Sequence, residues 1–160
     1  MHNMLASGGV LQYELNQLTR RIMRLGYSRA DLDSFAAIVK KPKHGITMLP
    51  RNFFLERIVD RDGSNLKGYA GEVLTLLSIL SYFCEKILMP GGRLPEECQC
   101  LRHAKRAMDI LTYHKVSMVD RLEDHLLKHH VLFAKLYADC VKFKPRWQLH
   151  VPAAVRRSIS

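Results

Sequence analysis

The stretch 73-VLTLLSILSYF-83 is the longest apolar run of the chain, and it decides the fold class. An α-helix has about 3.6 residues per turn, so a helix through this run is apolar on most of its sides. A helix of that kind is typical of the centre of a bundle rather than of its surface. The run is too short to cross a bilayer and is closed by Glu85 and Lys86. It therefore predicts a buried helix over residues 71–89 and no contact with a membrane.

Further helices are predicted on both sides of this run. An apolar stripe at three- and four-residue spacing predicts a helix over residues 10–25. Ser28, with an aspartate three residues on, has capping-box spacing and predicts the start of a second helix. Pro95 suits the first turn of another helix, and Ser117 predicts the cap of a last helix that runs to about residue 143. The stripe of the first helix consists of Leu11, Leu15, Leu18, Ile22 and Leu25.

No segment alternates between apolar and polar residues as a strand does. The predicted fold is therefore all-α, a single domain in which an irregular bundle of about five helices surrounds the central apolar helix. We expect residues 1–144 to form this domain. A basic loop at residues 40–52 lies inside it, because prolines and a glycine interrupt the helical pattern there. Residues 145–160 are expected to form a basic C-terminal tail.

The composition indicates a folded and strongly basic protein. Its 160 residues carry a formal net charge of +10, and 48% of them are hydrophobic. This charge favours anionic partners such as nucleic acid, acidic protein surfaces or anionic membranes, without choosing among them. The first residues, MHNMLASGGV, lack the features of a secretory signal. We therefore expect an intracellular protein of the nucleus or cytoplasm, with Cys84, Cys98, Cys100 and Cys140 as reduced thiols.

The histidine-rich stretch 124-DHLLKHHVLFAKLYADC-140 raises the possibility of a metal site. His125 and His129 have i, i+4 spacing and could bind one ion on a helix. However, the stretch lacks the glutamate of a HExxH metalloprotease, and Cys140 lies about 16 Å from His129 along a helix axis. A third ligand would have to come from elsewhere in the fold, and the sequence names none. We therefore predict packed or half-exposed histidines and no metal.

Other ligand and catalytic patterns are incomplete. Cys98 and Cys100 would point about 200° apart on a helix, and no second cysteine pair accompanies them. The chain contains neither a phosphate-binding glycine-rich loop nor a GxSxG elbow. A solvated turn explains Asp60 and Asp62. A helix N-terminus, where negative charge is favourable, explains Glu72. The expectation is a protein without catalytic activity, cofactor or small-molecule substrate, although a site assembled only in space is left open.

Two basic segments are the best candidates for contact with phosphates. Trp147 lies within the second of them, where it either stacks on a base or seals the helical core. The candidates in the loop are Lys40, Lys41, Lys43 and Arg51, and those in the tail are Lys142, Lys144, Arg146 and Trp147.

Three stretches, in this order, resemble segments of CACTA-type and related cut-and-paste transposases. The start, MHNMLASGGV, is similar to the residues that follow an acid in the family pattern Asp-x-Met-His-Asn. The segment 66-LKGYAGEVLTLLSILSYF-83 is similar to a lysine–small–acid stretch that leads into a long apolar helix. The segment 144-KPRWQLHVPAAV-155 is similar to the element Lys-Pro-x-x-His-x-x-x-His-x-Pro, with His150 retained and the first histidine replaced.

The resemblance implies a ribonuclease H-like enzyme in which carboxylates hold two divalent metal ions. In this chain the acid before the Met-His pair and the strands that would carry it are absent, and Glu72 is the only position that matches a further acid. The resemblance therefore implies the C-terminal helical part of a transposon-derived protein, truncated before the catalytic core.

The expected function is a non-catalytic helical domain that contacts nucleic acid through the basic loop and tail. The alternative is a helical protein-interaction or scaffold domain with no role in nucleic-acid binding. The sequence leaves the oligomeric state open.

Overall fold

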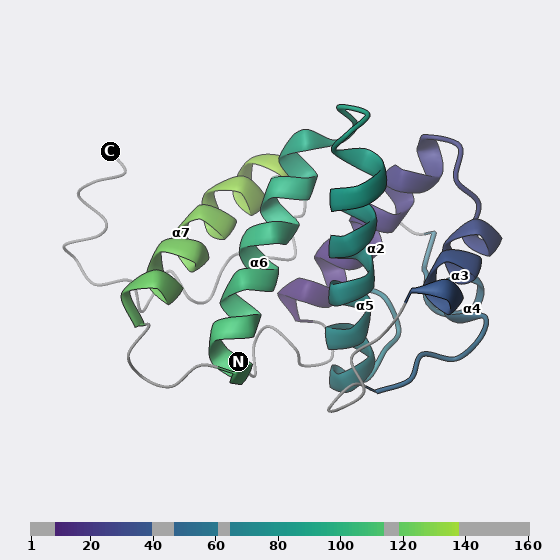
Figure 1. Ribbon diagram of the computed structural model, residues 1–160, viewed down its shortest axis with the longest axis horizontal. Helices are drawn as coiled ribbons and strands as arrows, with labels where there is room; N and C mark the ends of the chain where they lie inside the picture. The colour runs from purple at the N-terminus through teal and green to yellow at the C-terminus, as the bar shows by residue number, and fades with distance from the viewer. Residues whose placement is uncertain (1–8, 40–46, 61–64, 114–118, 138–160) are drawn as a thin grey trace.

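The computed structural model describes residues 9–39, 47–60, 65–113 and 119–137, and these residues form helices and the connections between them. No strand occurs in these ranges, so the predicted all-α bundle is confirmed (Figure 1). None of the helices in these ranges is long and apolar enough to cross a membrane. The helices are α2 (Val10–Arg24), α3 (Arg29–Ile38), α4 (Phe53–Arg57), α5 (Ala70–Phe83), the π-helical η1 (Cys84–Leu88), α6 (Pro95–Tyr113) and α7 (Val119–Leu136).

The helix boundaries follow the local signals of the sequence. At the start of α3 the Ser28 hydroxyl accepts a hydrogen bond from the Asp31 backbone N–H at 3.1 Å, and the Asp31 carboxylate accepts one from the Ser28 N–H at 2.7 Å. This is the predicted capping box. Gly26 follows α2 with φ of +103°, a left-handed conformation that favours glycine. The cap predicted at Ser117 lies outside the described residues.

The central apolar helix is α5, as predicted, and it packs against α2 and α6. Its buried side chains belong to the main hydrophobic core, which also takes residues from α2, α3, α4 and α6. The helix continues into η1, whose wider turn closes with a hydrogen bond from the Met89 N–H to the Cys84 carbonyl at 2.9 Å. The predicted extent, residues 71–89, is therefore confirmed, with a π-helical last turn. The α5 side chains of this core are Val73, Leu76, Leu77, Ile79, Leu80 and Phe83.

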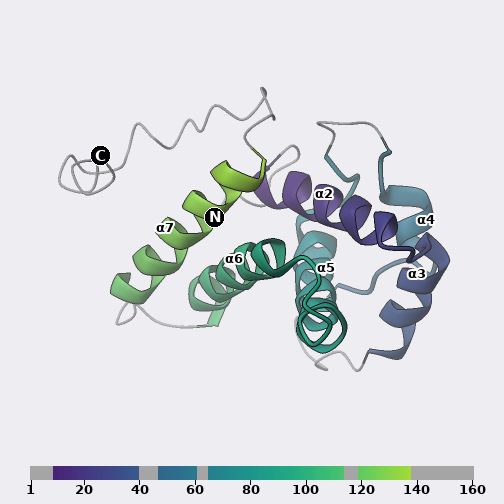
Figure 2. The same cartoon turned by 90° about the horizontal axis from the view of Figure 1, so that it is seen from above.

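Helix α2 corrects the expectation of one buried apolar stripe. Its polar residues Gln12, Glu14, Asn16 and Thr19 are buried as well. The reason is that two different segments cover this side of α2. The Gln12 side chain donates a hydrogen bond to the Gly68 carbonyl, and the Asn16 side chain bonds to the Val59 backbone. The end of α7 meets the start of α2, where His129 contacts Glu14 (Figure 2). Leu25, which the stripe included, is 38% exposed because it lies at the C-cap, beyond the last helical turn.

Helices α6 and α7 lie side by side and pack closely along their length (Figure 1). A second, smaller core forms where they meet α2. Tyr13 contacts the rings of Phe133 and Tyr137 there, with ring centroids 6.0 and 5.9 Å apart. Val10 and Cys100 complete this second core, so its residues come from α2, α6 and α7 together with Tyr137 just beyond α7.

Candidate functional site

Of the eight residues predicted to contact nucleic acid, only Arg51 lies within the described residues. It is exposed in the turn that precedes α4. Because the other seven lie outside these ranges, their arrangement on one face or several stays a prediction. They are Lys40, Lys41, Lys43, Lys142, Lys144, Arg146 and Trp147.

The charge of the protein is distributed very unevenly. The described ranges contain 15 Lys and Arg against 13 Asp and Glu, a net charge of +2. Of the total of +10, therefore, +8 belongs to the remaining segments, which hold ten basic and two acidic residues. The helical body is thus nearly neutral, and the basicity predicted to attract anions is concentrated in segments that include 40–46 and 138–160.

Glu72 has a structural partner. Its carboxylate accepts a hydrogen bond from the Tyr69 N–H at 2.8 Å, which caps the start of α5, and its side chain is buried. The predicted position at a helix N-terminus is confirmed. Asp60 forms an ion pair with Arg29, and Asp62 lies outside the described ranges. Within those ranges, Glu72 belongs to no group of side chains that could hold a metal ion.

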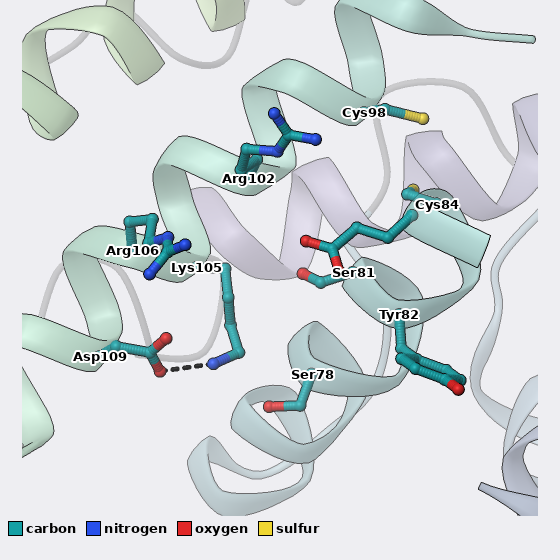
Figure 3. Close-up of a pocket in the computed structure, with 10 residues that line it drawn as sticks. Ser78, Ser81, Tyr82, Cys84, Cys98, Arg102, Lys105, Arg106 and Asp109 are labelled. Atoms are coloured by element: carbon teal, nitrogen blue, oxygen red, sulfur yellow. Dashed lines mark hydrogen bonds and ion pairs between the residues drawn. The ribbon is translucent and has the colours of Figure 1, made fainter. Parts of the chain in front are cut away.

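A cavity of about 220 Å³ lies between α5–η1 and α6 (Figure 3). Arg102, Lys105 and Arg106 line it from one face of α6, opposite hydroxyl groups of α5. Lys105 is paired with Asp109 at 2.5 Å, and the Arg102 guanidinium contacts the Met89 sulfur at 3.1 Å, which is a weak acceptor. The complete lining is Ser78, Ser81, Tyr82, Cys84, Glu85, Cys98, Arg102, Lys105, Arg106 and Asp109.

Three cations line this cavity together with two carboxylates, Glu85 and Asp109, so its formal net charge is only +1, and Lys105 is already paired with Asp109. Guanidinium and ammonium groups form strong hydrogen bonds to phosphate oxygens. The Ser81 hydroxyl is buried beside them without a hydrogen-bond partner among the described residues. The sequence prediction missed this cavity. The spacing of Arg102, Lys105 and Arg106 places these residues on one face of a helix, and this spacing could have indicated a basic face. Which face of α5 lies opposite them follows only from the packing of the two helices.

Cys84 and Cys98 lie next to one another at the end of this cavity (Figure 3). A hydrogen bond between the two sulfurs and the burial of Cys84 raise the pKa of the Cys84 thiol. Both are free thiols, as is Cys100, and Cys140 lies outside the described residues. Cys98 belongs to the main core and Cys100 to the second, so the two side chains point apart as the sequence predicted.

The histidines of α7 do not form a shared site. His125 lies against His103 of α6, with their Nδ1 atoms 3.1 Å apart. His129 turns instead toward α2, where its Nε2 atom lies 2.7 Å from the Glu14 carboxylate. The prediction of packed or half-exposed histidines is confirmed, since His129 is buried while His125 and His130 are partly buried.

The surroundings of His129 are a feature that the sequence did not reveal. Glu14, Cys100 and His129 come from three different helices, and their ligand atoms all lie within 4.8 Å of one another. The side chains of Glu14 and His129 are only 0% and 2% exposed. Residues 115 apart in the sequence meet here, so no local spacing could have indicated the contact.

This group does not have the properties of a catalytic nucleophile. Burial raises the pKa of the Cys100 thiol, and the nearby Glu14 charge raises it further. Reactive cysteines have the opposite character, because the thiolate must be accessible and favoured. A buried carboxylate, imidazole and thiol at this distance can instead form hydrogen bonds or hold a metal ion.

Comparisons of the chain with protein-family models, with curated proteins and with solved structures give no match. The resemblance to transposases stays a prediction that depends on the three stretches given above. The fold defines this protein as an all-α helical bundle. The buried residues Glu14, Cys100 and His129 lie at its second core.

Proposed function

We propose that this protein is a non-catalytic, transposon-derived helical domain that binds nucleic acid through its basic loop and tail. The single observation that supports this proposal best is the segregation of charge. A nearly neutral helical body accompanies segments that carry +8 of the net +10. Basic segments attached to a neutral body are typical of proteins that neutralise phosphates without reading sequence.

The phosphate backbone explains what such segments would do. Each phosphate that a lysine or arginine neutralises releases a condensed counterion, so binding weakens steeply as salt rises. These contacts position a protein on nucleic acid but carry little sequence information. On the body itself, Arg102, Lys105 and Arg106 add three basic groups at one cavity.

Fluorescence anisotropy with labelled duplexes of unrelated sequence tests the proposal. Affinity is expected to fall with a slope of about −0.9 per phosphate contact on a log–log plot against salt, and to vary little with sequence. The variant Lys142→Gln/Lys144→Gln/Arg146→Gln should lose roughly three phosphate contacts, so the slope should become less steep by about 0.9 for each of them. A matched control neutralises Arg24, Lys67 and Arg93, which are exposed on the helical body.

Two results would contradict the proposal. One is the absence of binding at low salt. The other is an equal loss of affinity in the tail variant and in the matched control, because that would assign the binding to net charge rather than to the tail.

The absence of catalysis is part of the same proposal. The one position that the resemblance matches to a catalytic acid, Glu72, is engaged in capping α5. A two-metal mechanism needs several carboxylates around a shared site. Magnesium-dependent nicking of a supercoiled plasmid by the purified protein, abolished by Glu72→Gln, would refute it.

A scaffold function is the second candidate, and one observation favours it. Met48 and Tyr69 are 73% and 75% exposed. Met48 follows Thr47, whose carbonyl accepts a hydrogen bond from the Thr75 hydroxyl at 2.8 Å, and Tyr69 precedes the start of α5. A contiguous exposed apolar patch is the mark of an interaction surface, so these two side chains are the first to test for one. Association that is insensitive to salt and is lost in Met48→Ser/Tyr69→Ser, measured by sedimentation, would support the scaffold instead.

A further inference from the structure

Glu14 of α2, Cys100 of α6 and His129 of α7 form the one group of potential metal ligands in the described part of the chain. Their ligand atoms, a carboxylate oxygen, a thiol sulfur and an imidazole nitrogen, lie within 4.8 Å of one another. All three side chains are buried. They come from the three helices that enclose the second core (Figure 2).

Protein contacts leave one of these ligand atoms, Glu14 Oε1, without a geometric hydrogen bond in the described part of the chain. Glu14 Oε2 contacts His129, but Glu14 Oε1 is buried with no hydrogen-bond partner among the described residues. The Cys100 thiol has a long contact of 3.8 Å to the His129 carbonyl, and a hydrogen bond with the Glu14 side chain contributes to the raised pKa of this thiol. An unpartnered carboxylate oxygen in a low-dielectric interior is costly, and natural structures usually supply a partner.

We propose that Glu14, Cys100 and His129 hold a single Zn²⁺ ion. His129 would supply a nitrogen, Cys100 a sulfur and Glu14 a carboxylate oxygen, which are three of the four ligands of a tetrahedral zinc site, and a water molecule would take the fourth position. The unpartnered Oε1 atom thereby gains a ligand role. The site would be structural, because it is closed to substrate and ties α2, α6 and α7 together.

Charge and ligand type both point to this class of ion. A thiolate and a carboxylate carry two negative charges, which a divalent cation neutralises. The neighbouring Arg21 and Glu97 form an ion pair with each other, so together they add no net charge to the site. Sulfur and imidazole ligands favour zinc, whereas magnesium and calcium require oxygen ligands.

Binding requires one proton to leave the site for each Zn–S bond that forms. The Cys100 thiol loses its proton to solvent and the sulfur bonds to zinc. The proton that His129 Nε2 and Glu14 Oε2 share must also leave their contact, so that His129 binds as a neutral imidazole and Glu14 as a carboxylate. Because the ligands are buried, we expect zinc to enter during folding rather than by diffusion into the folded bundle. Loading is therefore tested by refolding.

The first experiment refolds the full chain from denaturant, under reducing conditions, with zinc or with EDTA. Metal analysis after dialysis is expected to find one zinc per chain. At a free zinc concentration about 100-fold above Kd, the melting temperature should rise by roughly 5–10 °C over the EDTA sample. Absence of retained zinc, or an unchanged melting temperature, would overturn the proposal.

Matched cysteine variants locate the ion. Cys100→Ser and Glu14→Gln should each lose zinc, whereas Cys84→Ser should retain it, because Cys84 is an equally buried thiol in the main core. The reverse pattern, with zinc lost in Cys84→Ser and kept in Cys100→Ser, would place the ion at the Cys84–Cys98 pair and overturn the proposal.

A spectroscopic measurement on the unmodified protein does not depend on whether the variants fold. Refolding with Co²⁺ in place of zinc should give a sulfur-to-cobalt charge-transfer band and the strong d–d absorption of a tetrahedral site. Cobalt that binds without the charge-transfer band would exclude a thiolate ligand and refute the assignment to Cys100.

Discussion

The buried contact between Glu14 and His129 allows a quantitative prediction about stability. Its two side chains are 0% and 2% exposed, and the Glu14 Oε2 and His129 Nε2 atoms are 2.7 Å apart. Removing one partner leaves the other polar group buried without compensation, which typically costs about 3–5 kcal/mol. We therefore expect Glu14→Leu and His129→Leu each to lower the free energy of unfolding by about 3–5 kcal/mol, or the melting temperature by roughly 6–20 °C.

The double variant distinguishes this explanation from a general loss of packing. Glu14→Leu/His129→Leu removes both polar groups together, and replacing a buried pair with apolar residues is often close to neutral. Its cost should therefore be smaller than that of either single change. The resulting coupling free energy should exceed about 2 kcal/mol, because the two residues are in direct contact.

Urea unfolding, followed by circular dichroism with EDTA and reductant present, measures these differences without a contribution from metal. Comparable m-values among the variants are needed for the comparison, since m reports the surface exposed on unfolding. Lys128→Ala is the control on the same helix, because its pair with Asp124 is about half exposed, at 54% and 51%, and should leave the midpoint unchanged. Additive costs of the two single changes would refute the reasoning.

Three further predictions follow from the helix cap, the helix contact and the histidine pair. Glu72→Ala should cost about 1 kcal/mol, measured by urea unfolding, because the cap of α5 is lost. Gly71→Ala should lower the melting temperature although alanine favours helix, because the added Cβ would overlap the Thr47 hydroxyl. Burial, and then His125, lower the pKa of His103 below its ordinary 6.5. Below about pH 6.5 the unfolded chain therefore binds more protons than the folded protein. The contribution of His103 to stability is full above about pH 6.5 and is lost as the pH falls, so His103→Asn should make this decline smaller.

Each of these predictions has a control. Glu123→Ala changes an exposed glutamate of α7 and should not affect unfolding. Gly91→Ala should be tolerated, because the nearest atom to its Cβ is 3.6 Å away. The explanations would be wrong if Glu72→Ala matched Glu123→Ala, if Gly71→Ala stabilised the protein, or if His103→Asn left the decline of the melting temperature between pH 7 and pH 5 unchanged.

Much of the fold was predictable because its signals are local. The capping box at Ser28 involves neighbouring residues and needs no tertiary contact to form. The apolar run of α5 predicted a central helix for a similar reason, because a helix apolar on most sides can be stable only inside a bundle. The expected helix over residues 10–25 was also correct in extent.

The candidate sites were much less predictable. The cavity requires α6 to present Arg102, Lys105 and Arg106 to the hydroxyl groups of α5, which depends on how two helices are rotated against one another. The basic residues named from composition lie mostly outside the described residues, so their role stays a prediction.

The sequence by itself determined the helices, their caps and the central place of the apolar helix α5, because residues close along the chain decide these features through periodicity and backbone hydrogen bonds. Only the tertiary structure decided that α2 is buried on its polar side and that Glu14 meets His129 there. A polar face on a helix predicts exposure to water unless another helix covers it. Over Gln12 and Asn16 that cover comes from the backbone of Gly68 and Val59, and over Glu14 it comes from α7, more than a hundred residues away. No local spacing records which polar side chains will meet there.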